Sequence, residues 1–326
     1  MTKTILYDSA EMISCEEYKE IGNSQSFRKC RFCNGTLNSG ASFTNRSHAI
    51  SEGLGNHNVF CLDECDKCNA KFSTLEQSLV SFLNVPLCVY GIKGKHKKGK
   101  LDIRGIRTPK FNIGNSGEML LFKFNTSESS DLVIKPEDDS SINSFNIHSE
   151  PKWNKYIPTD IFRSLSKYIV AIAHNEHLPL LEKTISWINN GIGDVSNYNV
   201  IFINLEDVVT APRVAYFLCR QDDLGAVKIL GFLAIANVGF LFEIPFTEMG
   251  KLLSKEIRSK ALLSLCDKIY SSKAFNNLDL TSTELQLKPI EFNFQPNGDL
   301  KQNQDYFIID SQEKIKQILK DNNFIK

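Results

Sequence analysis

Two cysteine pairs near the start of the chain have the spacing of metal-binding knuckles. Cys30 and Cys33 lie in the stretch CRFC, and Cys65 and Cys68 lie in CDKC. Two thiolates three residues apart in a tight turn can both face one ion. Two such turns complete a closed, tetrahedral four-cysteine site. We therefore predict that these four cysteines hold a structural Zn²⁺ ion.

The rest of the composition favours metal binding over disulfide bonds. The chain has nine cysteines in 326 residues, and its first residues, MTKTILYDSAEMISCEEYKE, are too polar and acidic for a secretory signal. Paired cysteines in a reducing compartment bind metal more often than they form disulfides. We therefore expect a cytoplasmic protein. No apolar run is long enough to predict a membrane span.

The residues around the two pairs resemble the HNH endonuclease family. The stretches CRFC, FTNRSHAISEGLGN and DECDKCNAKF follow one another in the chain. They are similar to the family's C-x-x-C pair, its histidine with a short glycine-containing loop, and its second C-x-x-C pair at the start of a helix. The resemblance covers about residues 30–83 and implies a ββα-metal fold. It says little about residues 150–326.

The resemblance also implies roles for single residues. His48 would be the general base that activates water, and Asn69 would be a ligand of a catalytic Mg²⁺ or Mn²⁺ ion. Phosphodiester cleavage needs a base of this kind and a hard cation on the leaving oxygen. Asn56 is the preferred candidate for the family's middle asparagine, with Asn58 second. Two structural alternatives stay open: Asn69 can cap its helix, and Asn56 can permit a left-handed turn after Gly55.

Two positions depart from the family pattern. Ser47 stands where many members have a metal-binding acidic residue or histidine, and Ser51 stands where a proline is common. Glu52, Glu64 or Asp66 could supply the missing carboxylate, and the sequence does not choose among them.

A basic segment follows the proposed nuclease module. Eight Lys or Arg residues and one acid lie between Gly91 and Lys110, in a chain whose formal net charge is zero. We expect this segment to follow the phosphate backbone of double-stranded DNA, because few aromatic residues are present to stack on single-stranded bases. The alternative is a solvated hairpin tip. The candidate DNA-binding residues are Lys93, Lys95, Lys97, Lys98, Lys100, Arg104 and Arg107.

Hydrophobic spacing predicts the elements that position these groups. In the N-terminal half we expect a short acidic helix over 9–20, a helix over 68–84, and strands at 118–125 and 131–136. In the C-terminal half we expect two helices that begin at Pro158 and break near Pro179, and then four short strands. The strands are predicted at 199–205, 213–221, 227–236 and 239–246. A helix at 247–271, a strand near 291–295 and a helix over 311–323 complete the prediction.

These elements predict an α+β protein. Its expected parts are a polar lead-in (1–27), a ββα-metal (HNH) module (28–90), a basic β-rich segment (91–150) and a mixed α/β domain with antiparallel strands (151–326). The last domain would recognise a target, form a homo-oligomer or sense a small-molecule or protein regulator. It contains no catalytic motif, and we expect its His174 and His177 near a helix end, facing solvent.

The leading interpretation is a metal-dependent endonuclease that acts on DNA. Similar HNH proteins serve in bacterial restriction and anti-phage defence, so the resemblance implies such a role. The alternative is a non-catalytic module that binds nucleic acid or another protein, in which the zinc knuckles are only architectural. Ser47, in place of a metal-binding residue, favours this alternative.

Overall fold

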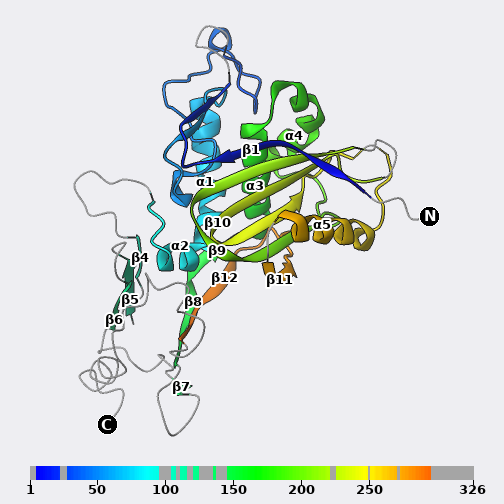
Figure 1. The fold of residues 1–326 in the computed structure, drawn as a ribbon. Coiled ribbons are helices and arrows are strands. Elements are labelled where there is room, and N and C mark those ends of the chain that lie inside the picture. The colour runs from blue at the N-terminus through cyan, green and yellow to red at the C-terminus, as the bar shows by residue number, and fades with distance from the viewer. Residues whose placement is uncertain are drawn as a thin grey trace. The chain divides into compact units, whose positions relative to one another are not determined.

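The computed structural model describes residues 5–22, 28–94, 104–107, 111–115, 120–124, 135–136, 145–220, 225–248, 250–269 and 272–294 (Figure 1). The chain forms two compact units. The first joins Met1–Val80 to Tyr156–Leu285, and the second joins Ser81–Lys155 to Gln286–Lys326. These bounds differ from the four expected ranges, because the cysteine-rich segment packs with the chain that follows residue 156.

A four-stranded antiparallel sheet is the base of the first unit (Figure 1). Its strands are β1 (Tyr7–Ser14), β9 (Val200–Cys219), β10 (Ile229–Glu243) and β11 (Ser272–Asn277). β9 is the central strand. Its C-terminal half pairs with β1, its N-terminal half pairs with β11, and β10 runs along its other edge.

Two long strands stand where the sequence predicts four short ones. β9 and β10 both continue through the positions expected to be turns. The register of the pair shifts on either side of Ala236, which has a positive φ of 53°. Such β-bulges bend a strand without ending it. The predicted turns are therefore bends within a continuous hairpin.

The predicted acidic helix over 9–20 is wrong. The structure has β1, a turn and the short strand β2 (Lys19–Ile21) in this region. Along β1 only Ile13 is buried, and the strand pairs through its backbone with β9. The polar side chains of this segment correctly indicated an exposed element. It is a strand and not a helix because it pairs with the edge of β9, which lies about 200 residues further along the chain.

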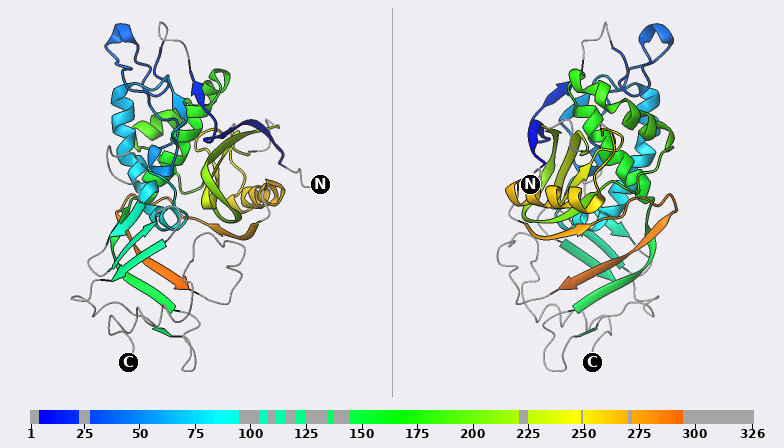
Figure 2. Two further views of the ribbon diagram at one scale, coloured as in Figure 1. Left: turned by 60° about the vertical axis from the view of Figure 1, so that its left-hand side comes forward. Right: turned by 90° about the vertical axis from the view of Figure 1, so that its right-hand side faces the viewer.

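Two α-helices and a 3-10 helix pack on the sheet (Figure 2). They are α3 (Pro158–Ile172), η5 (Asn175–Leu181) and α4 (Glu182–Asn190), which confirms the predicted start at Pro158 and the break at Pro179. α3 packs tightly on β10 at Gly231, where an added Cβ would lie 2.8 Å from Ile169 Cγ1 and 2.4 Å from the Phe242 ring. Only glycine permits this contact. α5 (Lys255–Ile269) contacts β10 and β11 and is shorter than predicted.

The cysteine-rich part of the first unit has little regular structure before its helix. β2 pairs in parallel with β3 (Val59–Cys61), and His48 forms an isolated antiparallel bridge with Phe60. Two short 3-10 helices, η2 (Leu37–Ser39) and η3 (Glu52–Leu54), precede α1 (Asp66–Phe82). α1 confirms the helix predicted over 68–84.

The described residues of the second unit form a short helix and two small sheets. The elements are α2 (Asn84–Val89), the sheet β4 (Arg104–Arg107), β5 (Phe111–Asn115) and β6 (Leu120–Phe124), and the sheet β7 (Lys135–Pro136), β8 (Phe145–Tyr156) and β12 (Gln286–Phe294). The strand predicted at 118–125 is β6, and the one near 291–295 is part of β12. The helix predicted over 311–323 lies outside the described residues.

Helices and strands thus occur together in the first unit, in agreement with the predicted α+β class. Among the helices that the structure describes, none combines the length and the apolar character needed to cross a membrane.

Candidate functional site

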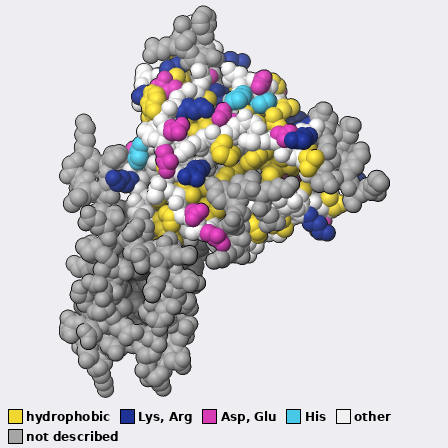
Figure 3. Space-filling view, viewed as in Figure 1, with side chains coloured by type: hydrophobic (Ala, Val, Ile, Leu, Met, Phe, Trp, Pro, Cys, Tyr) yellow, Lys and Arg dark blue, Asp and Glu magenta, His cyan; other side chains and the backbone are white. Residues whose placement is uncertain are grey.

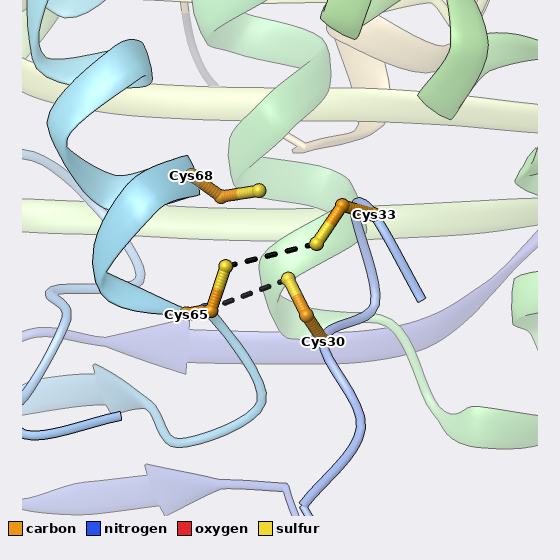
Figure 4. A group of neighbouring side chains, drawn as sticks. All are labelled: Cys30, Cys33, Cys65 and Cys68. Atoms are coloured by element: carbon orange, nitrogen blue, oxygen red, sulfur yellow. Dashed lines mark hydrogen bonds between the residues drawn. The ribbon is translucent and has the colours of Figure 1, made fainter. Parts of the chain in front are cut away.

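Four cysteine side chains converge from two segments of the chain (Figure 4). The sulfur atoms of Cys30, Cys33, Cys65 and Cys68 all lie within 4.8 Å of one another. Cys33 Sγ and Cys65 Sγ are 3.7 Å apart. A tetrahedral site with Zn–S bonds of about 2.3 Å places its sulfurs about 3.8 Å apart. The predicted convergence is confirmed, and the four cysteines could hold a zinc ion with little movement.

Backbone hydrogen bonds shape each half of this cluster. In the first half, the Asn34 N–H donates to the Cys30 carbonyl and the Cys30 N–H donates to the Gly35 carbonyl, both at 2.8 Å. Asn34 has a φ of 59°, which asparagine tolerates better than most residues. In the second half, the Cys65 N–H donates to Cys30 Sγ at 3.4 Å. The backbone thus fixes the sulfurs locally, and the spacing of the cysteines was sufficient to predict them.

One cysteine of the cluster, Cys30, differs from the isolated cysteines in the direction of its pKa shift. A hydrogen bond from Cys68 lowers the pKa of Cys30 to about 5, whereas burial raises the pKa of Cys15 and of Cys61 to about 12. Thiolates, not thiols, bind metals. Cys30 alone among the shifted thiols of the cluster favours the thiolate, because burial raises the pKa of Cys65 to about 11 and the hydrogen bond with Cys30 raises that of Cys68. Zinc binding would therefore release protons from the cluster.

Arg31, inside the first cysteine pair, joins the cluster to α3. Its Nη1 donates to the carbonyls of Val170, Ala171 and Ala173 at 2.8, 3.0 and 3.1 Å. Its Nη2 lies 3.5 Å from Asp63 Oδ2, and both side chains are buried. Carbonyls at a helix C-terminus have no partner within the helix and favour a cation. Arg31 supplies the missing hydrogen-bond donor and the positive charge, although it lies 139 residues from Val170 in the sequence.

Replacing Arg31 with methionine is expected to destabilise the first unit by about 3–5 kcal/mol, because Asp63 loses its buried cation and three carbonyls lose a donor. Denaturant unfolding followed by circular dichroism measures the change. Exposed Arg213 on β9 offers a matched control, for which Arg213→Met should change stability by less than about 0.5 kcal/mol. Equal effects of the two substitutions would contradict the capping role.

His48 lies on a short extended segment beside β3. The Ala49 N–H donates to the Val59 carbonyl at 3.1 Å, and the His48 ring packs on Phe60 with centroids 4.8 Å apart. Burial lowers the pKa of His48, against a weaker opposite effect of Glu52. The imidazole is therefore neutral at neutral pH. Its Nδ1 is buried and has no hydrogen-bond partner among the residues that the structure describes, and such a nitrogen calls for a water, an ion or a catalytic role.

The side chain of Asn56 is fully used by the loop that it closes. Its Nδ2 donates to the carbonyls of Ile50 and Val59 at 2.7 and 2.8 Å. Its Oδ1 accepts from the N–H groups of Asn58 and Val59 at 3.2 and 2.9 Å. Asn56 is completely buried. It therefore holds the segment after His48 against β3, and its oxygen is not free for a metal ion.

Asn69 lies in the first turn of α1 and is half-buried. The helix begins three residues earlier, at Asp66, and the Asn69 N–H donates to the Cys65 carbonyl at 2.9 Å. Asn69 is thus inside the helix, and the capping alternative is wrong. Its role as a metal ligand stays a prediction.

The three candidate carboxylates have different surroundings. Asp66 accepts hydrogen bonds from Ser42, Thr44 and Asn45, which outweigh burial and lower its pKa. Glu64 is buried, and its Oε2 lies 3.1 Å from Lys167 Nζ. These two carboxylates hold the scaffold together.

Glu52 differs from the other two because its carboxylate stays partly exposed. It acts on the pKa of His48, and its Oε1 lies 4.0 Å from His57 Nδ1. His57 also acts on the pKa of His48. His48, Glu52 and His57 thus form one group, which we call the His48 cluster. Among the three candidates, Glu52 is best placed to bind a cation beside His48.

Lys167 on α3 contacts two buried or half-buried carboxylates and the segment that carries His48. Its Nζ lies 3.1 Å from Glu64 Oε2, 3.1 Å from Glu76 Oε1 and 3.2 Å from the His48 carbonyl oxygen. Burial pulls its pKa down, but Glu64 and Glu76 outweigh that effect and leave it raised. Lys167 therefore stays charged and ties α1 and the His48 segment to α3. Nothing in the local sequence around Lys167 signals this role.

Most of the predicted DNA-binding residues cannot be placed. Lys93 is exposed, and Arg104 and Arg107 lie on β4. Lys95, Lys97, Lys98 and Lys100 lie outside the described residues. On the face drawn in Figure 3, described basic and acidic side chains are interspersed. Any concentrated basic surface must therefore come from the basic segment itself or from another face.

Comparison of the chain with protein families, with curated proteins and with solved structures finds no significant match.

Proposed function

We propose that this protein is a metal-dependent endonuclease that hydrolyses DNA phosphodiester bonds through an HNH-like module. The observation that carries the proposal is the His48 cluster. A neutral imidazole with an unpartnered Nδ1 stands beside a partly exposed carboxylate, on a segment fixed by Asn56 and Lys167. This arrangement is rigid and contains a base, as the resemblance to HNH endonucleases requires.

Each residue of the site has a role in the proposed reaction. His48 takes the proton from the attacking water, which it can do because burial keeps it neutral. Glu52 and Asn69 would hold a divalent ion such as Mg²⁺ or Mn²⁺, whose chemistry is to stabilise negative charge on the leaving oxygen. The four cysteines would hold Zn²⁺ as a structural ion, since a closed four-thiolate site leaves no open position.

The proposed substrate and biological role are supported by fewer observations than the proposed reaction. Double-stranded DNA is proposed because the basic segment follows the module in sequence. A role in restriction or anti-phage defence is implied by the resemblance alone. For the part of the chain after residue 156, target recognition, oligomerisation and ligand sensing remain the candidate roles.

A second candidate function is a zinc-stabilised module that binds nucleic acid without cutting it. Ser47 favours it, because its hydroxyl is buried and donates to the Glu64 carbonyl at 3.3 Å. The position before the histidine therefore lacks the metal-binding side chain that many HNH endonucleases have there.

A cleavage assay distinguishes the two candidates. The zinc-loaded protein is incubated with supercoiled plasmid, with and without Mn²⁺. Metal-dependent nicking or linearisation supports the enzyme, whereas salt-sensitive binding without cutting at any metal concentration supports the second candidate.

Glu52→Gln is expected to raise the Mn²⁺ concentration needed for half-maximal cleavage by about ten-fold or more, because an amide binds a hard cation more weakly than a carboxylate. Titrating Mn²⁺ at fixed plasmid concentration measures the shift. Glu284→Gln, at an exposed position of the same unit, is the matched control and should leave the titration unchanged. An unchanged titration for Glu52→Gln would remove Glu52 from the site.

A further inference from the structure

A second group of metal-ligand side chains lies at the start of η5 and shares no residue with the four-cysteine group or the His48 cluster. It consists of His174, Glu176 and His177, whose nearest ligand atoms all lie within 4.8 Å of one another. His174 Nδ1 lies 3.8 Å from Glu176 Oε1, and His177 Nε2 lies 3.7 Å from the same oxygen. Two imidazole nitrogens and a carboxylate oxygen thus lie within a few ångströms of one another.

The outer nitrogen of each ring is already held by a partner. His174 Nε2 lies 2.8 Å from Glu11 Oε2 on β1, and His177 Nδ1 lies 2.8 Å from the Tyr216 hydroxyl on β9. An ionised carboxylate can only accept, so His174 donates through Nε2 and keeps its lone pair on Nδ1, the nitrogen that faces Glu176. Metal-binding histidines are commonly held in this way, by a carboxylate or another oxygen on the far nitrogen.

The rings are also fixed in orientation by packing. The two imidazoles are stacked, with centroids 5.7 Å apart and an angle of 14° between planes, and Tyr216 meets both edge-on. Tyr216 is fully buried, and its hydroxyl accepts the His174 N–H at 3.2 Å. The His177 N–H donates to the His174 carbonyl at 2.9 Å. The positions of both rings are therefore set before any ion binds.

A simple ion-pair cluster explains this arrangement less well. Glu176 can pair with His174 only if that ring is protonated, because its Nε2–H is already donated to Glu11. In a tetrahedral site with metal bonds of about 2.0–2.1 Å, ligand atoms lie about 3.3–3.4 Å apart. Glu176 has an exposed side chain (74%) and can close the remaining gap. Histidine and acidic side chains also meet at the surface in Figure 3.

We propose that His174, Glu176 and His177 form a second metal site, which binds a divalent transition-metal ion and leaves one position open to solvent. Two imidazoles favour Zn²⁺, Ni²⁺ or Cu²⁺ over Mg²⁺ and Ca²⁺, which prefer oxygen ligands. Three protein ligands with an open position are typical of zinc sites that bind water or an exogenous ligand. The site does not depend on the proposed nuclease activity, because it shares no residue with it.

The test is a metal titration of the full chain with its cysteine site already loaded with zinc. Isothermal titration calorimetry with Ni²⁺, carried out on the Glu52→Gln variant so that the proposed catalytic ion site is weakened, is expected to show one further ion bound per chain. Glu176→Gln, an exposed substitution, should weaken that binding by about ten-fold, and Glu11→Gln should weaken it by about 10–100-fold through His174. Both variants should keep the cysteine-bound zinc.

Two outcomes would overturn this site. One is a titration of Glu52→Gln with no further Ni²⁺ bound. The other is binding that is unchanged in both Glu176→Gln and the double variant His174→Ala/His177→Ala, which would assign the ion to other residues. Glu284→Gln, an exposed substitution outside both proposed ion sites, serves as the matched control and should leave this Ni²⁺ binding unchanged.

Discussion

Cys68→Ser is expected to abolish high-affinity zinc binding and to unfold the segment from Cys30 to Cys65. Structural zinc contributes about 10–16 kcal/mol of apparent binding free energy in small modules. No single packing contact in this segment approaches that value. Metal analysis of the purified protein should show one zinc ion per chain in the wild type and none in the variant. Proteolysis should then cut the variant between the two cysteine pairs.

Cys15→Ala is the matched control for this loss. Cys15 is as buried as Cys68, but it is not part of the four-sulfur group, and its thiol is held protonated by burial. Its substitution should cost about 1 kcal/mol of stability and no zinc. Zinc retained in Cys68→Ser, or zinc lost in Cys15→Ala, would contradict the assignment of the four ligands.

Loss of the zinc is expected to affect α3 and the His48 cluster as well as the two cysteine pairs. Arg31 sits between two of the ligands and caps α3, and Lys167 on α3 contacts the His48 carbonyl. When the first cysteine pair loosens, Arg31 can no longer hold the end of the helix. The zinc ion, α3 and the His48 cluster are therefore mechanically connected, although the ion would take no part in the reaction.

The sequence predicted the parts of this site whose geometry is local. The convergence of Cys30 with Cys33, and of Cys65 with Cys68, follows from a turn of a few residues. α1 was likewise readable, because its apolar spacing and its start at the second pair lie within one segment. Local geometry survives whatever fold surrounds it, which is why these predictions are confirmed.

Other features depend on contacts between distant segments and could not be predicted. Glu52, Glu64 and Asp66 are alike in sequence, and only the position of Lys167 and of the 42–45 loop shows which carboxylate is left near His48. β1 is a strand because β9 offers an edge to it. The partners of His174 on β1 and β9 likewise could not be predicted from the spacing of residues in the sequence.

His48→Gln is expected to lower the rate of Mn²⁺-dependent plasmid cleavage by about 10²–10⁴-fold, the usual contribution of a general base. Glutamine can pack on Phe60 in place of the imidazole but cannot take a proton from water. Unfolding by denaturant and zinc content should stay close to wild type, so that the loss is one of chemistry. Lys183→Ala, an exposed substitution on α4, should cleave as wild type does.

The pH dependence separates a base from a residue that only positions the substrate. Because burial lowers the pKa of His48 below its usual value near 6.5, the neutral base persists under mildly acidic conditions. Cleavage should therefore be constant above about pH 6.5 and fall only below it, as the imidazole gains its proton. Glu52 raises the pKa of His48, so Glu52→Gln, assayed at saturating Mn²⁺, should move this acid limb to lower pH. A limb that stays in place in Glu52→Gln, or a rate unchanged in His48→Gln, would assign the water-activating step to another group.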